Sequence, residues 1–294
     1  MFFIESKLLN MIYEKFGNLK SNSQVTIDHL MLVLPKDSAK FTAYALTHEW
    51  LTVYNDEEVT HPTVVMHEIG HNLGLEHSAK GDNEYGDEVG IMGYGNTLNG
   101  RKCYNAVKSW QMGWYTDGHK IIDPYQGAFE GNIVGLANFN QRGDKNVLLK
   151  IVGHVDNNDY YVSFNRRIGM NKDSTVGNNK VIITSHSSSL TANSADILSY
   201  QKAILSQGEI YALPDFNGGD GEKKLTLYVI VNKIYEGKSP AYVNISIILK
   251  DGDDDSIDGL LKGNRNEKNN NKKKNRIKKK KKIKKNRNKN KLIN

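Results

Sequence analysis

The sequence predicts an α+β protein with two folded domains and a disordered basic tail. In the first part of the chain, segments with helical apolar spacing precede and follow two strand-like segments. From about residue 121 onward, short runs rich in Val and Ile are separated by Asn, Gly and Asp turns, which is typical of all-β domains. We therefore expect a mixed sheet with one functional helix in residues 1–120 and a sandwich-like β domain in residues 121–250. Residues 251–294 are expected to form an acidic linker and a Lys/Asn-rich tail.

The first domain is expected to contain a helix, two strands and a second helix. Residues 4–16 place apolar side chains close to helical spacing. Residues 25–34 form a strand-like run that ends at Pro35, and residues 43–54 form a second apolar run. We expect the second helix to open at Thr60, whose hydroxyl can cap it, because a proline two residues later is tolerated in a first helical turn.

The second domain is predicted from six short segments of β-forming residues. They are residues 133–136, 146–152, 160–164, 180–184, 225–231 and 242–249. No helical pattern separates them, so a sandwich or a similar all-β arrangement is expected.

The strongest functional signal is the motif H-E-x-x-H-x-x-G-x-x-H, which runs from His67 to His77. On a helix, His67 and His71 lie one turn apart on one face, which suits two ligands of a tetrahedral zinc ion. Gly74 can adopt the left-handed conformation that ends a helix, so the chain can turn back and present His77 as a third ligand. The fourth position stays open for water, as in catalytic zinc sites. Glu68 can accept a proton from that water without binding the metal.

A second motif follows the histidines at a suitable distance. The segment Gly90–Tyr94 carries Met92 at its centre, and together the two motifs match the metzincin signature. The chain therefore resembles the metzincin zinc peptidases. The resemblance implies a Met turn in which Met92 forms a hydrophobic floor under the metal. A thioether is a poor zinc ligand beside three imidazoles.

Four further segments resemble one family within the metzincins, the gametolysin peptidases. They are Glu84–Asp87, Ile91–Tyr94, Cys103–Ala106 and Lys108–Tyr115. The similarity is dense from about residue 59 to residue 115, thinner to about residue 249 and absent from the last forty-odd residues. It implies an extracellular zinc endopeptidase whose substrates are proteins, such as cell-wall or matrix glycoproteins. It also implies a helix in residues 105–114.

The resemblance suggests a role for Tyr94, which lies two residues after Met92. In some metzincins, such as the astacin type, a tyrosine in this position donates a hydrogen bond to the oxyanion of the transition state. The alternative is an aromatic ring that packs under the turn, and the sequence does not decide between the two.

Calcium is a second candidate cation, because the loop after the histidines is acidic. Asp82, Glu84, Asp87 and Glu88 offer the carboxylates that a hard cation takes. Their spacing matches no known calcium loop, so a solvated acidic loop is the favoured interpretation.

Composition gives little support for secretion. The chain has one cysteine, Cys103, so it cannot form an intrachain disulfide framework. The apolar start is interrupted by Glu5 and is too short for a signal peptide. We expect that the natural N-terminus, with its signal peptide and prosegment, is missing. No run of about 18 apolar residues predicts a membrane span.

Two alternative functions remain from other classes. The first is an inactive, metal-stabilised binding scaffold, but all three histidines and Glu68 are present. The second takes the tail as the functional part, because residues 262–294 carry 17 Lys and Arg and a single acid. Such a tail could hold the protein on an anionic surface. It has no aromatic residues on which bases could stack, so we expect no specific nucleic-acid partner.

Overall fold

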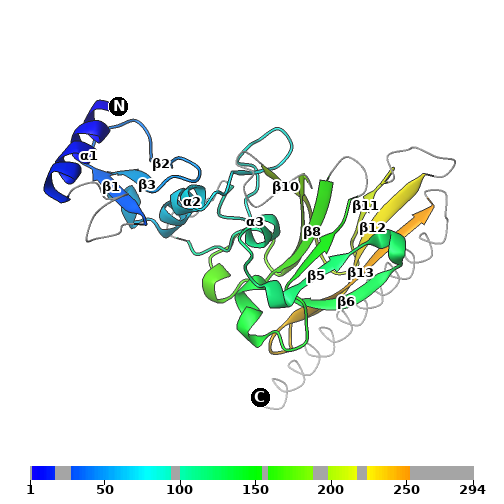
Figure 1. The fold of residues 1–294 in the computed structure, drawn as a ribbon. Helices are drawn as coiled ribbons and strands as arrows, with labels where there is room; N and C mark the ends of the chain where they lie inside the picture. Colours follow the sequence, from blue (N-terminus) through cyan, green and yellow to red (C-terminus); the bar gives the residue numbers. More distant parts are fainter. Residues whose placement is uncertain are drawn as a thin grey trace, which may run out of the picture.

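Three β-sheets carry the fold of the computed structural model (Figure 1). The structure describes residues 2–16, 28–93, 100–153, 158–187, 198–216 and 224–251. Within them, a three-stranded sheet has the order β1-β3-β2, a six-stranded sheet the order β4-β10-β9-β8-β7-β5, and a four-stranded sheet the order β11-β12-β13-β6. The mixed α+β class is confirmed. The tail and most of the acidic linker lie outside the described residues.

The three-stranded sheet and two helices make up the N-terminal part. The elements are α1 (Phe2–Phe16), β1 (Leu30–Leu34), β2 (Ala43–Ala45), β3 (Leu51–Asn55), the short 3-10 helix η1 (Asp56–Thr60) and α2 (Pro62–Asn72). β1 runs parallel to β3 and β2 runs antiparallel to it, so the sheet is mixed, as predicted. Leu8 and Ile12 of α1 pack on Leu32, Leu34 and Val53 of the sheet, which buries the apolar side of the helix.

The start of α2 differs from the prediction. The helix begins at Pro62, and His61 takes the cap position without a side-chain hydrogen bond to the helix. The hydroxyl of Thr60 instead donates to the carbonyl of Glu57, at 2.6 Å. Thr60 cannot cap α2 because η1 already occupies this segment and directs the hydroxyl back into its own turn.

The two larger sheets share one apolar core. The six-stranded sheet contains β4 (Ser78–Ala79), β5 (His119–Ile122), β7 (Leu148–Ile151), β8 (Asn158–Asn165), β9 (Lys180–Ser187) and β10 (Ser199–Leu205). The four-stranded sheet contains β6 (Phe129–Val134), β11 (Ile210–Leu213), β12 (Leu225–Tyr235) and β13 (Tyr242–Asp251). Apolar side chains of both sheets meet in one cluster, among them Val162, Phe164, Ile183, Val229 and Ile245. The six predicted segments are strands or lie beside them, whereas β4, β5, β10 and β11 were not predicted.

Short helices connect these strands. They are α3 (Ala106–Gln111), η2 (Thr116–Gly118), η3 (Pro124–Gln126), η4 (Leu136–Gln141) and η5 (Gly169–Asn171). The helix expected in residues 105–114 is present as α3, and Asn105 caps it by accepting a hydrogen bond from the Lys108 amide, at 3.0 Å. In the described segments, no helix is long and apolar enough to cross a membrane.

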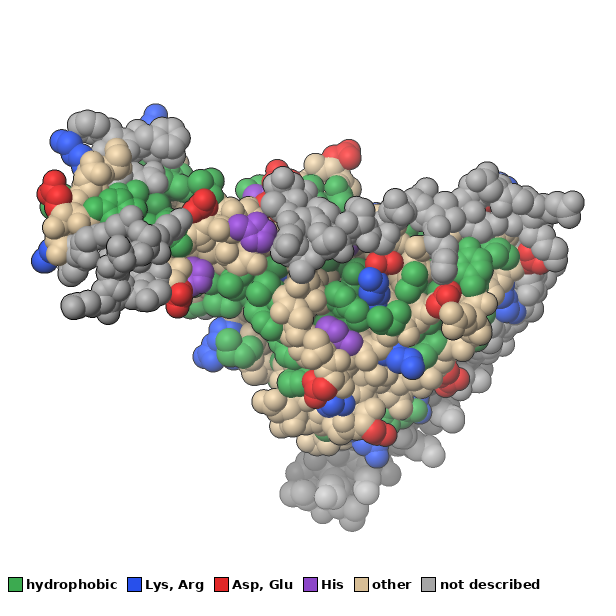
Figure 2. Space-filling model, in the orientation of Figure 1, with side chains coloured by type: hydrophobic (Ala, Val, Ile, Leu, Met, Phe, Trp, Pro, Cys, Tyr) green, Lys and Arg blue, Asp and Glu red, His purple; other side chains and the backbone are tan. Residues whose placement is uncertain are grey.

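Contacts cross the predicted domain boundary at residue 120. β4 pairs with β10, and Val107 of α3 packs in a cluster with Leu148 and Tyr161. The division into two domains therefore stays a prediction. Figure 2 shows the N-terminal sheet and α1 as a smaller lobe beside the larger body, with histidine side chains at the surface where the molecule narrows.

Candidate metal centre and active-site groove

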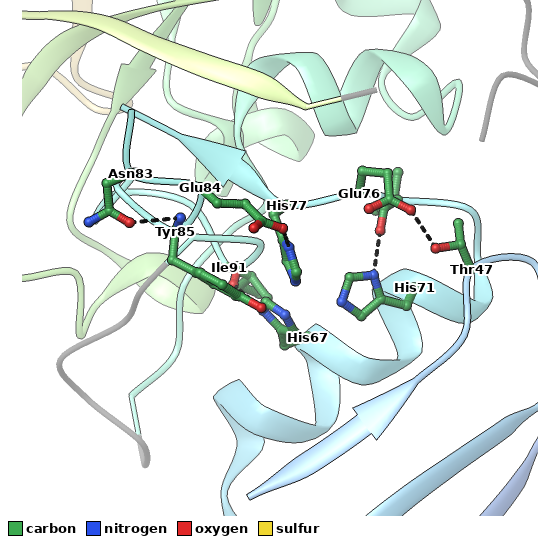
Figure 3. A network of polar contacts seen from close by, with 10 residues as sticks. Thr47, His67, His71, Glu76, His77, Asn83, Glu84, Tyr85 and Ile91 are labelled. Carbon is green, nitrogen blue, oxygen red and sulfur yellow. Dashed lines mark hydrogen bonds and ion pairs between the residues drawn. The ribbon is translucent and has the colours of Figure 1, made fainter. Parts of the chain in front are cut away.

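Three histidines from α2 and the segment after it converge on one point (Figure 3). α2 places the rings of His67 and His71 4.9 Å apart, because residues four apart share a helix face. Gly74 follows with a φ of +85°, and the chain turns back so that the ring of His77 lies 5.3 Å from that of His67 and 4.8 Å from that of His71. One nitrogen from each ring lies within 4.8 Å of the others.

Each of the three rings is oriented by an acceptor at Nδ1. The acceptors are the Ile91 carbonyl for His67, at 3.0 Å, and the Leu75 carbonyl for His71, at 2.8 Å. The Glu84 carboxylate accepts from His77. Because Nδ1 then carries the proton, Nε2 of each ring keeps its lone pair for a metal ion.

Burial keeps two of these rings neutral. It lowers the pKa of His67 to about 4, helped by the nearby rings of His71 and His77. The pKa of His71 is also lowered, mainly by burial. A neutral imidazole is the form that binds metal, so the site is ready for a cation at neutral pH.

Glu68 lies beside the histidines, and its carboxyl group has a raised pKa. Its side chain is buried, and burial raises its pKa to about 7, although a hydrogen bond from the Ala45 backbone acts in the opposite direction. A carboxyl group with a pKa near 7 can both accept and release a proton at neutral pH.

A groove of about 630 Å³ runs along this site. Its lining comes from the start of β2, from η1, from α2 and from the loop after β4: Thr42, Ala43, Glu58, Thr63, Val64, His67, Glu68, Tyr85, Ile91 and Gly93. The histidine site and Glu68 are therefore open to a ligand of peptide size.

The predicted Met turn lies under α2. Met92 is fully buried in a cluster with Leu75, Ile91 and Tyr104, and its backbone carbonyl accepts a hydrogen bond from the Ser78 amide, at 2.8 Å. This bond ties the turn to the residue that follows His77. The turn and the third histidine are thereby held together.

A buried carboxylate, Asp87, connects the turn to the β-sheet body. Its oxygens accept hydrogen bonds from the Val89 and Gly90 amides, at 2.9 and 3.2 Å, and from the side chains of Asn105 and Gln201, at 3.0 and 3.1 Å. Asp87 has no exposed surface, which excludes it from the surface calcium loop considered above. Among the residues that the structure describes, the three histidines form the only group of three or more His, Cys, Asp and Glu side chains gathered closely enough to hold a metal.

The N-terminal sheet is fixed to α2 by hydrogen bonds near the second histidine. Asn72 donates from its side chain to the carbonyls of Leu46 and Leu51, at 3.3 and 3.2 Å, and the His48 amide donates to the His71 carbonyl, at 3.0 Å. Leu46 follows β2 and Leu51 begins β3, so both strands are held against the helix that carries the histidines.

The structure thus brings together His67, His71, His77, Glu68 and Met92. Tyr94 lies outside the described residues. Sequence reasoning missed the roles of three residues: Glu84, which orients His77, Tyr85, which lines the groove, and Asp87. The signal was present, because all three lie in the Glu84–Asp87 segment that carried the family resemblance.

Comparison with known proteins identifies the family. The sequence profile of the family described as "Gametolysin peptidase M11" matches residues 20–205, which include the three histidines, Glu68 and the strands up to β10. The chain belongs to the gametolysin peptidase family. Membership implies a metallopeptidase, a hydrolase that acts on proteins and needs a metal ion. The three imidazoles with free Nε2 atoms fit that requirement.

One relative that matches part of this chain is an autolysin from Chlamydomonas reinhardtii. It is 44% identical over 52 residues, which is 17% of this chain and 8% of the autolysin. The match therefore spans less than a tenth of that relative's length. The search of solved structures found no significant match.

Proposed function

We propose that the chain is a zinc-dependent endopeptidase of the metzincin type, with His67, His71 and His77 as the zinc ligands. The observation that carries the proposal is the convergence of three oriented imidazoles beside the buried carboxyl group of Glu68. Three imidazoles suit zinc, which takes nitrogen ligands in a tetrahedral site and keeps one position open in enzymes. The Met turn at Met92 supports the same class as a hydrophobic floor.

In this proposal Glu68 moves the proton. When bound, a zinc ion polarises the scissile carbonyl and makes hydroxide available at neutral pH. Glu68 accepts the proton of the attacking water and passes it to the amine nitrogen as the C–N bond breaks.

The groove supports an extended peptide as the substrate. β2 is the last strand of its sheet in the described residues, and Ala43 of this strand lines the groove. A strand at the edge of a sheet can form backbone hydrogen bonds with an extended peptide. Such binding uses the peptide backbone and leaves both ends of the chain free, as an endopeptidase requires.

The substrate class and location that we propose come from the family. They are cell-wall or extracellular-matrix glycoproteins and an extracellular site of action, in line with the name of the autolysin relative. The basic tail would add electrostatic attachment to an anionic polymer or membrane surface. Tyr94 stays a candidate oxyanion donor, with packing under the turn as the alternative.

The test is metal analysis combined with cleavage of a peptide library. We expect about one zinc per chain, loss of activity with a chelator and recovery with Zn²⁺. Glu68→Gln should keep the zinc and lose activity by orders of magnitude, because the substitution removes the proton carrier and leaves the ligands. Cleavage at the wild-type rate by a zinc-loaded Glu68→Gln variant would refute the mechanism.

A further inference from the structure

We propose that Tyr85 is a further catalytic residue, whose phenol hydroxyl donates a hydrogen bond to the scissile carbonyl oxygen as negative charge develops on it. The inference rests on the proposed function, because it requires peptide hydrolysis at the histidine site. It concerns a residue upstream of the Met turn, at a different position from Tyr94.

Tyr85 lies at the histidine site. The ring of Tyr85 lies 4.0 Å from the ring of His77 and 6.2 Å from that of His67, measured between centroids. Figure 3 shows the side chain running from its loop past His77 toward His67. Tyr85 is 40% exposed and lines the groove together with Glu68. A peptide bond placed for attack beside Glu68 is therefore within reach of the Tyr85 side chain.

The loop around Tyr85 holds this residue in place before substrate binds. The Tyr85 amide donates to the Asn83 side chain, at 3.1 Å, and the Gly86 amide donates to the Asn83 carbonyl, at 2.9 Å. On one side Glu84 contacts His77, and on the other Asp87 is anchored in the body. A hydrogen-bond donor that is fixed in advance stabilises a transition state without a cost of reorganisation.

The chemistry of peptide hydrolysis also favours a hydrogen-bond donor at this position. Water adds to the carbonyl carbon, the π electron pair moves onto the carbonyl oxygen, and Glu68 takes the proton of the water. The Tyr85 hydroxyl donates a hydrogen bond to this oxygen and keeps its own proton. When the C–N bond breaks, the electron pair returns to the carbonyl and Glu68 protonates the nitrogen. The hydrogen bond is strongest when the oxygen is charged, so it favours the transition state over the bound substrate.

Another hydroxyl in the groove is already engaged. Thr63 donates to the carbonyl of Gly100, at 2.7 Å, and its side chain is buried. Tyr85 instead combines partial exposure with direct contact to the ring of His77.

The experiment compares Tyr85→Phe with wild type in the zinc-loaded full chain. Phenylalanine keeps the ring on His77 and removes only the hydroxyl. We expect kcat to fall by about 100-fold, as for the loss of one oxyanion donor, with KM within about twofold. The affinity for a phosphinic peptide, which mimics the charged tetrahedral state, should fall by a similar factor. Zinc content should stay at the wild-type level. Tyr125→Phe, an exposed tyrosine in η3, is the matched control and should behave as wild type.

Each contrary outcome has a clear meaning. A zinc-loaded Tyr85→Phe variant with unchanged kcat overturns the inference, and so does a variant that loses zinc, because the hydroxyl would then support the metal site. Tyr94→Phe is measured in parallel, and a loss confined to that variant would assign the donor to Tyr94. Glu68→Gln distinguishes a failure of the proposed function from a failure of the role of Tyr85. If it stays active, the proposed function fails, whereas an inactive Glu68→Gln beside an unaffected Tyr85→Phe removes only the role of Tyr85.

Discussion

Met92 packs directly against the backbone of α2 at Gly70. A Cβ atom at Gly70 would lie 2.5 Å from the sulfur of Met92 and 3.2 Å from the ring of Tyr104. The side chains under the helix therefore occupy the space that any larger residue at position 70 would need. The close approach explains why a glycine stands between Glu68 and His71 in a helix where alanine would have the better propensity.

The first prediction concerns Gly70→Ala. Alanine should gain up to about 1 kcal/mol from helix propensity, but overpacking against Met92 should cost about 1–3 kcal/mol. We expect a net loss of thermal stability together with weaker zinc binding, because the Met turn must move. Gly237→Ala is the control, since a Cβ at Gly237 meets no atom within 4 Å. Calorimetry and zinc titration of both variants provide the check, and a Gly70→Ala variant as stable as the control would contradict the packing argument.

The second prediction concerns Asp87→Ala. The substitution removes the common acceptor of four hydrogen bonds and leaves the donors of Asn105 and Gln201 buried without it. We expect a loss of about 2–4 kcal/mol in the free energy of unfolding, within the range for a broken buried network. Asp144→Ala, at a carboxylate with 95% side-chain exposure, should leave the free energy of unfolding close to that of wild type. Denaturant titration measures both, and equal effects would show that the network is not needed for stability.

The third prediction concerns pH and Lys108. Burial lowers the pKa of Lys108 from 10.5 to about 7 in the folded protein, with Glu76 and Asp87 acting in the opposite direction. At pH values between these two pKa values, Lys108 is protonated in the unfolded chain and deprotonated in the folded protein. The contribution of Lys108 to the free energy of unfolding therefore rises with pH from about 7 to about 10.5, by at most about 1.4 kcal/mol per pH unit.

Lys108→Met should remove this slope. The difference in free energy of unfolding between wild type and variant is measured by denaturant titration at several pH values. Contributions from the other titrating groups cancel in this difference. Lys238→Met, at an exposed lysine, is the control and should leave the slope unchanged. A pH-independent difference for Lys108→Met would contradict the lowered pKa, because it would show that the ammonium group of Lys108 stays protonated in the folded protein as readily as in the unfolded chain.

The fourth prediction concerns the tail. Deletion of residues 252–294 should leave the melting temperature and the cleavage of a short neutral peptide unchanged, because β13 ends at Asp251 and the tail carries few apolar residues. Binding to anionic vesicles should fall after the deletion. In the full chain it should weaken steeply with salt, since exposed charges are screened beyond about 10 Å at 0.1 M. A large drop in melting temperature would show that the tail packs on the body.

The sequence by itself determined the candidate metal ligands. The spacing of His67, His71 and His77 around Gly74 predicts their convergence, because a helix and a left-handed turn are local structures with known geometry. Membership of the family could also be predicted from short segments, and the profile match confirms it. The longer strands were predictable because a buried strand requires a continuous run of β-forming apolar residues.

Only the tertiary structure decided what surrounds the metal site. β4 and β10 were missed because one is two residues long and the other is stabilised by its partner strands rather than by its own pattern. Asp87 is acidic and lies in a polar loop, so its sequence context suggested solvent or calcium. It is buried because donors from Asn105 and Gln201, distant in the sequence, surround it. Tyr85 reaches His77 through the same folded loop. Such contacts depend on which segments the sheets bring together, and no local pattern encodes that pairing.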